Sequence, residues 1–478
     1  MNVFETLSHA ARQWPNRPAV IDGARSLDYQ SLWREVEALR VQLDRLCVRE
    51  GQGVGVQAHN GPAFIIAAMA ALGCGAVVMP IHHQFRPDEL AGMLMRAPLS
   101  AIIADENCPC PADGMHRTLD LPDRTPLRFT RLTRSAPLAP WVGDAAFVRF
   151  TSGTTGLAKG VILTHKGVLE RIGAANAGLG LGCKDKVLWI LPMAYHFFVS
   201  ILLYLEVGAA IVVSPDHLAE SVLDAAVRHK ATFLYAAPMH VRMLAADVSR
   251  LMFPRTLKRV MSVASRLHPQ VAKGFLSRYG VPVTQGYGII EVGLPIMNLK
   301  DAMEHPEAIG RPLPTFDAAI LDKEMKPVAD GETGELAVRG PGMFAGYLSP
   351  RLERDEVLRN GWFMTGDLAR RDRAGLITID GRSKSVINVA GHKVFPEDVA
   401  AVLEQHPAVL RSRVTTRPHP RMGEIVHAEV QLREANATVA SEDIMAFCRR
   451  RLSSYKAPAS IDLVAEIHLT PSGKVRHG

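Results

Sequence analysis

The chain has 478 residues, of which 47% are hydrophobic and 22% charged, and its formal net charge is +7 at pH 7. This composition fits a globular protein with a large core and about three domains. The basic residues are scattered without interleaved aromatic side chains, so we expect solvated surface and no nucleic-acid partner. The six cysteines include one close pair, Cys108 and Cys110, and fit reduced thiols in a cytoplasmic protein.

Nothing in the sequence predicts a leader or a membrane span. The first twenty residues carry charges early and lack an apolar signal core. Two apolar stretches, 63–81 and 195–215, are interrupted by proline, glycine or charged residues. Each predicts a buried helix followed by a buried strand rather than a transmembrane helix.

Helices and strands are expected to alternate through the first 310 residues, with an irregular, proline-rich connection at 108–140. Such alternation predicts parallel sheets with helices on both faces. After Gly310, short strands separated by turns predict a small β-barrel or sandwich, and the last 95 or so residues predict an α+β module. The predicted helices are 63–72, 88–96, 167–177, 197–205, 219–229, 239–247, 269–278, 396–405 and 441–452; the predicted strands include 19–22, 76–79, 101–104, 187–191, 209–213, 232–235, 260–263, 283–285, 318–321, 334–339, 376–379, 386–389, 411–416 and 428–432.

The stretch 150–160, Phe-Thr-Ser-Gly-Thr-Thr-Gly-Leu-Ala-Lys-Gly, lies between two apolar runs. Its glycines allow backbone N–H groups to converge on an anion, its hydroxyls add donors, and Lys159 adds a mobile positive charge. We interpret it as a polyphosphate-binding loop between two strands, with a surface hairpin as the alternative. It differs from the common P-loop, in which Ser or Thr follows Gly-Lys.

Further motifs follow in a fixed order, and together they resemble the adenylate-forming superfamily of acyl- and aryl-CoA ligases, luciferases and peptide-synthetase adenylation domains. The resemblance spans about residues 5 to 476. The motifs are the loop 150–160, Gln-Gly-Tyr-Gly-Ile-Ile-Glu at 285–291, Trp-Phe-Met-Thr-Gly-Asp at 362–367, Gly-Arg at 381–382, Ala-Gly-His-Lys-Val at 390–394 and Pro-Ser-Gly-Lys-Val at 471–475.

The resemblance implies a domain architecture and a role for particular residues in each domain. A large N-terminal domain, 1–381, would contain two layered αβ subdomains and a small β-barrel; a hinge at 382–384 would include Lys384; and a small mobile α+β domain, 385–478, would carry the catalytic Lys474. The catalytic set would be Lys474, Thr151, His196 and Glu291. The β- and γ-phosphates would be bound by Thr151, Ser152, Gly153, Thr154, Thr155, Gly156 and Lys159.

The same resemblance assigns the nucleotide and thiol contacts. Glu291 would hold Mg²⁺ on the triphosphate, since Mg²⁺ prefers hard oxygen ligands. Gly391 and Lys393 would line the thiol tunnel. The adenine and ribose would meet Gly286, Tyr287, Gly288, Asp367 and Arg382. Two departures from the pattern are Ala158 in place of proline and Ile290 in place of threonine.

The implied reaction is activation of a carboxylic acid by ATP to acyl-AMP and pyrophosphate, followed by transfer to a thiol. Positioned cations and Mg²⁺ would stabilise the charge on the phosphoryl oxygens. We expect coenzyme A as the thiol, with the phosphopantetheine of an acyl carrier protein as the alternative. A degenerate protein that only binds adenylate is a third reading, which the presence of Lys474 and Glu291 disfavours.

The acyl pocket is expected at His196, Phe197, Phe198, Val263 and Ala264. Amino-acid-activating relatives carry Asp where this chain has Phe198, and a buried ammonium without a carboxylate is costly. Val263 and Ala264 replace the glycines that relatives use at the pocket floor. We therefore expect a short, medium or aromatic acid that is not an α-amino acid. The identity of the acid and the oligomeric state are not encoded in any pattern we recognise.

Overall fold

The computed structural model describes the chain except for residues 1, 86, 110, 112–113, 122–125, 134–136, 151–158, 383–386, 390–391, 420–422, 435–438, 453, 455, 470–474 and 476–478. The chain divides into two compact units. Unit 1 contains the described residues of Met1–Thr151, Ala158–Ala318 and Val338–Phe363, and unit 2 contains those of Ala319–Ala337 and Met364–Gly478. The predicted boundaries at 381 and 385 stay a prediction.

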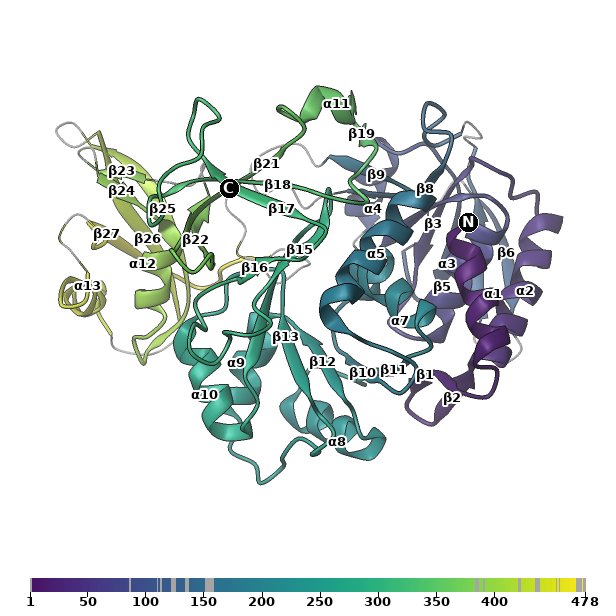
Figure 1. The fold of residues 1–478 in the computed structure, drawn as a ribbon, viewed down its shortest axis with the longest axis horizontal. Coiled ribbons are helices and arrows are strands. Elements are labelled where there is room, and N and C mark those ends of the chain that lie inside the picture. The colour runs from purple at the N-terminus through teal and green to yellow at the C-terminus, as the bar shows by residue number, and fades with distance from the viewer. Residues whose placement is uncertain are drawn as a thin grey trace. The chain divides into compact units, whose positions relative to one another are not determined.

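Unit 1 contains two nine-stranded sheets (Figure 1). In the first sheet, six consecutive strands are parallel, as the alternating pattern predicts. Its order is β16 (Arg311–Pro312), β15 (Gly293–Met297), β14 (Val283–Ile289), β13 (Arg259–Ser262), β12 (Phe233–Ala236), β10 (Lys186–Trp189), β11 (Ala210–Val213), β1 (Pro18–Asp22) and β2 (Arg25–Asp28).

The second sheet of unit 1 mixes parallel and antiparallel pairs. Its centre is parallel, whereas β8 and β9 form the antiparallel pair that flanks the residues 151–158. Its order is β20 (Arg351–Glu353), β19 (Gly346–Leu348), β9 (Gly160–Thr164), β8 (Ala145–Phe150), β4 (Val77–Ile81), β3 (Gly53–Gln57), β5 (Leu99–Asp105), β7 (Pro126–Arg131) and β6 (Met115–Asp120).

The prediction of an irregular segment at 108–140 is wrong in part, because β6 and β7 lie there and pair antiparallel with each other and with β5. β6 is an edge strand with five exposed residues out of six. An exposed edge strand needs no apolar alternation, so its sequence pattern carries little signal.

Helices cover both faces of the first sheet. α5 contacts β15 of the first sheet and β8 and β9 of the second, so it lies between the two sheets. α8 and α10 contact β10 and β14 from the outer face (Figure 1). The helices are α1 (Val3–Gln13), α2 (Tyr29–Arg45), α3 (Pro62–Gly73), α4 (Pro87–Leu94), α5 (His165–Leu179), α6 (Met193–His196), the π-helix η1 (Phe197–Ile201), α7 (Leu202–Glu206), α8 (Ala219–His229), α9 (Pro238–Ala246), α10 (Pro269–Tyr279) and α11 (Arg354–Val357).

Local chemistry fixes where α5 begins, directly after β9. Thr164 is the N-cap, and its hydroxyl accepts a hydrogen bond from the Gly167 N–H at 2.9 Å. The chain therefore turns from strand to helix within one residue. This turn places the first two turns of α5, with Glu170 and Arg171, beside the loop that contains Gly342.

A four-stranded sheet follows, for which the sequence predicted a barrel or sandwich. Its order is β17 (Asp317–Leu321), β18 (Gly334–Arg339), β21 (Phe363–Arg371) and β22 (Ile377–Arg382). The rest of unit 2 is a sheet with two helices, as predicted. It contains β24 (His392–Val394), β23 (Ile387–Val389), β26 (Gly423–Leu432), β25 (Val409–His419), β27 (Ser460–Val464), α12 (Pro396–Leu403) and α13 (Ser441–Arg449).

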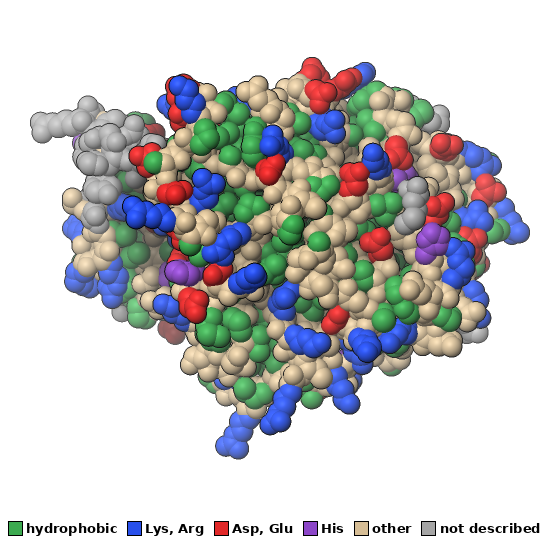
Figure 2. Space-filling model, in the orientation of Figure 1, with side chains coloured by type: hydrophobic (Ala, Val, Ile, Leu, Met, Phe, Trp, Pro, Cys, Tyr) green, Lys and Arg blue, Asp and Glu red, His purple; other side chains and the backbone are tan. Residues whose placement is uncertain are grey.

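The distribution of charged side chains and the character of the described helices are as expected from the sequence composition. Figure 2 shows basic and acidic side chains interspersed over most of the visible face. Among the described residues, no helix has both the length and the apolar character that crossing a membrane requires. Both apolar stretches noted in the sequence form a helix and then a strand, although 197–205 is a π-helix followed by α7 rather than one α-helix.

Candidate active site

Glu291 lies in the turn between β14 and β15 of unit 1. Its Oε1 accepts a hydrogen bond from the Tyr347 hydroxyl at 3.0 Å, and its carbonyl oxygen accepts one from the Phe344 N–H at 2.7 Å. Burial raises the pKa of the Glu291 carboxyl, and the hydrogen bond from Tyr347 and the cations Lys159 and Arg171 oppose the rise. The structure thus holds one carboxylate oxygen in place while keeping the carboxylate near two positive charges.

Lys159 follows the residues 151–158 at the start of β9. Its ammonium nitrogen lies 4.5 Å from the centre of the Tyr347 ring. β19 pairs with β9 so that Tyr347 lies opposite Val161, which brings the tyrosine beside the lysine. Tyr347 therefore links Lys159 to Glu291, the two unit 1 residues to which the sequence assigned phosphate and metal contacts. The sequence analysis missed Tyr347.

Arg171 of α5 is hydrogen-bonded to the turn between β14 and β15 that contains Glu291. Its Nη1 donates to the carbonyl oxygen of Ile290 at 2.8 Å, and its Nε and Nη2 donate to that of Gly342, the former at 3.0 Å. The side chain is buried, and burial lowers its pKa to about 10. Arg171 consequently ties the residue before Glu291 to the loop of Gly342. The sequence analysis missed it too.

The glycines of the 285–291 motif are required by the β14–β15 hairpin itself. A Cβ on Gly288 would lie 2.8 Å from the Gly293 carbonyl oxygen, and a Cβ on Gly286 would lie 3.3 Å from Val263. The sequence analysis explained these glycines by contact with adenine. Close packing against the backbone is a second reason for glycine at 288, whereas the neighbours of Gly286 are side chains.

Gln285 anchors the start of that motif. Its side chain is buried and accepts a hydrogen bond from the Leu267 N–H at 3.0 Å. Its Nε2 donates to the carbonyl oxygens of Pro306 and Ala308 at 2.6 and 3.3 Å. These bonds join two loops to β14 at the end of the first sheet, so the motif residues that follow start from a fixed point.

The predicted acyl-pocket residues His196, Phe197 and Phe198 lie at the junction of α6 and η1. Phe197 and Phe198 are fully buried and pack against Phe147 of β8. The π-helix, in which the Leu202 N–H donates to the Phe197 carbonyl oxygen, breaks the regular helix that the sequence predicted. Such helices often occur at functional sites because they re-aim side chains.

His196 itself is partly exposed and lies between two aromatic rings. Its ring centre is 5.6 Å from that of Trp189 and 5.7 Å from that of Tyr235, edge-on in both cases. Burial, and then the charge of Arg149, lower the pKa of His196 to about 3. His196 is therefore neutral near pH 7.

Val263 and Ala264 follow β13. Val263 is buried and its N–H donates to the Ala236 carbonyl oxygen at 3.0 Å, whereas Ala264 is exposed with φ +76°. A glycine adopts that φ without strain, and an L-alanine does so at a cost of about 1 kcal/mol. The backbone thus keeps a shape suited to glycine while carrying the extra methyl group.

Unit 2 contains the predicted ribose contacts, Asp367 and Arg382. They lie opposite each other on β21 and β22, and the Arg382 Nε forms an ion pair with the Asp367 Oδ1 at 2.8 Å. The side chain of Asp367 is only 8% exposed. The aspartate is thereby oriented by a charged neighbour, as a hydrogen-bond acceptor for hydroxyl groups needs to be.

Several predicted residues lie outside the described part of the chain. Lys393 lies in β24, but the structure does not describe its side chain. Within unit 1, Lys159 and Glu291 both contact Tyr347, and His196 lies between two aromatic rings, at what we call the aromatic end. The predicted site residues outside the described ranges are Thr151, Ser152, Gly153, Thr154, Thr155, Gly156, Lys384, Gly391 and Lys474.

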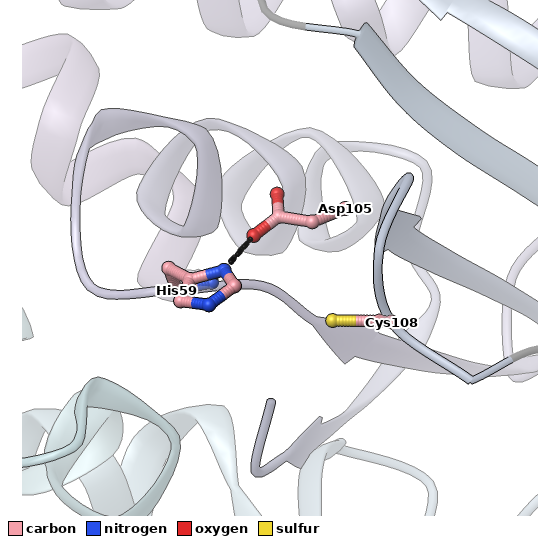
Figure 3. Close-up of side chains that lie close together, drawn as sticks. All are labelled: His59, Asp105 and Cys108. Atoms are coloured by element: carbon pink, nitrogen blue, oxygen red, sulfur yellow. Dashed lines mark hydrogen bonds and ion pairs between the residues drawn. The ribbon is translucent and has the colours of Figure 1, made fainter. Parts of the chain in front are cut away.

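His59, Asp105 and Cys108 form a cluster with the composition of a metal site (Figure 3). Their ligand atoms lie within 4.8 Å of one another. The backbone N–H and the Nδ1 of His59 both contact the Asp105 Oδ2 at 2.7 Å, and burial raises the pKa of the Cys108 thiol to about 11. An ion bound here would have to replace the contact between the His59 Nδ1 and Asp105 and deprotonate the Cys108 thiol, so we assign none.

Two family models match the chain. Residues 7–348 match the AMP-binding enzyme family, and residues 398–474 match the AMP-binding enzyme C-terminal domain. The chain is 30% identical to a sulfoacetate–CoA ligase from Cupriavidus necator, over 99% of this chain and 97% of that protein. It is also 27% identical to a feruloyl-CoA synthase from Amycolatopsis, over 98% and 96%.

The chain therefore belongs to the AMP-binding enzyme family, whose members here are AMP-forming acid–thiol ligases. Solved structures show the same fold. The o-succinylbenzoate CoA synthetase of Bacillus subtilis, in complex with its acyl-adenylate intermediate, superposes with a TM-score of 0.86 over 100% of this chain and 97% of that chain, at 22% identity. The MatB protein of Rhodopseudomonas palustris, with ATP bound, gives a TM-score of 0.83 at 21% identity, over 100% and 97%.

Proposed function

We propose that this chain activates a carboxylic acid without an α-amino group as its acyl-AMP and transfers the acyl group to coenzyme A. The observation that carries the proposal is the cluster of Glu291, Tyr347 and Lys159, which places a carboxylate and a cation at one point beside the loop 150–160. Matching ATP- and magnesium-bound relatives of the same fold support ATP as the co-substrate.

In the first step a carboxylate oxygen of the acid attacks the α-phosphorus of ATP, and the bond to the β-phosphate oxygen breaks. Negative charge moves onto the departing pyrophosphate, which Lys159 and the loop hydroxyls would bind. In the second step the thiol sulfur attacks the carbonyl carbon, loses its proton, and AMP leaves. Lys474 is proposed to bridge the carboxylate and the α-phosphate in the first step.

Glu291 fits the role of a Mg²⁺ ligand. It offers a hard oxygen, and Tyr347 orients the carboxylate from one side. When bound, Mg²⁺ neutralises charge on the phosphate oxygens. Tyr347 is a positioning residue in this scheme: burial and the neighbouring Glu291 raise its pKa, so it stays protonated and donates.

The charges around the aromatic end support an acid without an ammonium group. Phe198 is buried where amino-acid-activating relatives carry an aspartate, and the guanidinium carbon of Arg149 lies 6.0 Å from its ring centre. A second cation there would be repelled by Arg149 and would find no carboxylate. The relatives named above act on sulfoacetate and on feruloyl substrates, so their names do not select one acid.

Coenzyme A is the proposed acceptor because the curated relatives above are CoA ligases or synthases. A long-chain-fatty-acid–CoA ligase of Escherichia coli O157:H7 is 26% identical over 99% of this chain and 93% of that protein. The phosphopantetheine of a carrier protein stays the alternative acceptor. With either acceptor, we propose that this chain is located in the cytoplasm.

The test is a panel of carboxylic acids with ATP, Mg²⁺ and either coenzyme A or a pantetheinylated carrier protein, with products identified by mass spectrometry. We expect pyrophosphate release that depends on the acid, and a CoA thioester. Lys474→Ala should abolish the release while ATP still binds. ATP binding without release for any acid would instead identify an adenylate-binding protein without catalysis.

A further inference from the structure

Arg149 is a cation in an otherwise apolar strand, and it lies on the aromatic end of the site. On β8 it shares a face with Phe147, because side chains two apart on a strand point the same way. Phe147 packs against Phe198, with ring centres 5.7 Å apart. The guanidinium carbon of Arg149 lies 4.6 Å from the centre of the Tyr195 ring, next to His196.

Among the described residues, only one hydrogen bond and one unpartnered nitrogen are found on this guanidinium. Its Nη1 donates to the Tyr195 carbonyl oxygen at 3.2 Å, and its Nε is buried without a partner among the described residues. Burial lowers the pKa of Arg149, and the charges of Tyr195 and Glu291 oppose this only in part. A partly buried guanidinium with free N–H groups is costly unless an anion pairs with it.

The other anions of the proposed reaction have receptors of their own. Lys159 and the loop hydroxyls are assigned to the departing pyrophosphate, and Lys474 is assigned to the α-phosphate and the reacting carboxylate. Arg149 instead contacts the rings of Tyr195 and Phe198 and carries enough charge at His196 to lower the pKa of that residue. These contacts place Arg149 at the predicted acyl pocket, so an anion that pairs with it there would belong to the acyl part of the substrate.

We propose that Arg149 binds a second anionic group on the acid, so that the substrate is a short acid with an oxyanion, a carboxylate or a sulfonate, at its far end. This inference rests on the proposed function. A guanidinium offers a planar fork of N–H donors that fits both groups. We take the acid to be short because Arg149 contacts Tyr195, the residue that precedes His196 in the predicted acyl pocket.

The neutral state of His196 fits this arrangement. A protonated His196 would add a second positive charge near Arg149 and could itself bind the anion of the substrate. The neutral ring can only form a hydrogen bond or a van der Waals contact with the substrate. The aromatic rings of Trp189 and Tyr235 fix its orientation. Arg149 is then the one cation that the described residues place among these rings.

The test compares acids in pairs that differ only in the charge of the far group: malonate with malonamate, succinate with succinamate, and sulfoacetate with methylsulfonylacetate. We expect kcat/KM for pyrophosphate release by the native enzyme to favour the anionic member by about 10-fold or more. The carboxylate and sulfonate pairs show which oxyanion is preferred. Arg149→Met should reduce the ratio towards one, and Arg149→Lys should keep part of it.

Arg228→Met is the matched control, since Arg228 is an exposed arginine of α8 that pairs with Asp224, and it should keep the native ratio. Equal losses on both members of each pair in Arg149→Met would overturn the inference and give Arg149 a structural role or one at the reacting carboxylate. A native enzyme that uses simple monoacids without any preference for the anionic members overturns it as well. Absence of pyrophosphate release with every acid overturns the proposed function itself. If Arg149→Met does not fold, the comparison of paired acids on the native enzyme still tests the inference.

Discussion

The Tyr347 hydroxyl donates a 3.0 Å hydrogen bond to the carboxylate of Glu291, a residue 56 positions earlier in the chain. Tyr347→Phe should weaken binding of Mg²⁺–ATP by about 10-fold, because a hydrogen bond to a charged group contributes about 1.5–3 kcal/mol. Titration calorimetry measures this directly.

The control for this change is Tyr279→Phe. The Tyr279 hydroxyl donates to the Leu244 carbonyl oxygen at 2.9 Å, far along the chain from the motifs. That variant should lose some stability and keep its affinity for Mg²⁺–ATP. Equal affinity losses in the two variants would contradict a positioning role for Tyr347.

The raised pKa of Glu291 predicts a pH dependence. A carboxyl whose pKa is raised in the folded state binds its proton more tightly there than in the unfolded chain. Its contribution to the free energy of unfolding therefore falls as pH rises from the pKa of the unfolded chain to the raised pKa of the folded protein. The ionised form is the one that binds a cation. Affinity for Mg²⁺–ATP should therefore fall as pH is lowered through the raised pKa, and Glu291→Gln should give weak binding that lacks this dependence. The same slope in both proteins would contradict the assignment.

Arg171→Met should lower the free energy of unfolding by about 2–5 kcal/mol, because it leaves the carbonyl oxygens of Ile290 and Gly342 without their donor. Urea denaturation measures the loss. Arg228→Met, which removes an exposed pair within one helix, should cost about 0.5 kcal/mol or less. If the two losses were similar, the buried arginine would not be holding the two loops together.

Gly288→Ala should impair both folding and ATP binding, because the new Cβ would lie 2.8 Å from the Gly293 carbonyl oxygen, a backbone atom that cannot rotate away. Gly274→Ala in α10 is the matched control, since its Cβ would meet only Ala245 at 3.8 Å. This control should gain about 0.5–1 kcal/mol of stability, as alanine favours a helix over glycine. Melting temperatures and ATP affinity distinguish the two, and a mild effect at Gly288 would show that the hairpin can open.

Much of unit 1 was predictable because buried parallel strands and the helices between them have strong periodic patterns. The helix at 219–229 has the predicted bounds, and the strand pattern near 209–213 is off by one residue. The exposed edge strand β6 lacked such a pattern and was missed. The π-helix at Phe197–Ile201 was missed because its side chains are as apolar as those of an α-helix.

Residues inside contiguous motifs could be singled out from the sequence, and their roles in the site stay a prediction, whereas partners distant in sequence could not be singled out. Tyr347 and Arg171 act by contacts across 56 and 119 residues, which no local spacing encodes. Arg149 did carry a signal, because it is the single charged side chain in the strand Ala145–Phe150. A charge at a buried strand position predicts either an ion pair or a ligand.

In the proposed first step, a carboxylate oxygen of the substrate attacks the α-phosphorus of ATP. This step is tested most directly with an acid whose carboxylate carries a heavy oxygen isotope, followed by mass spectrometry of the nucleotide after thioester formation. The account predicts one labelled oxygen in AMP, with unlabelled pyrophosphate as the other product. Label in inorganic phosphate together with ADP, or AMP without label, would contradict it.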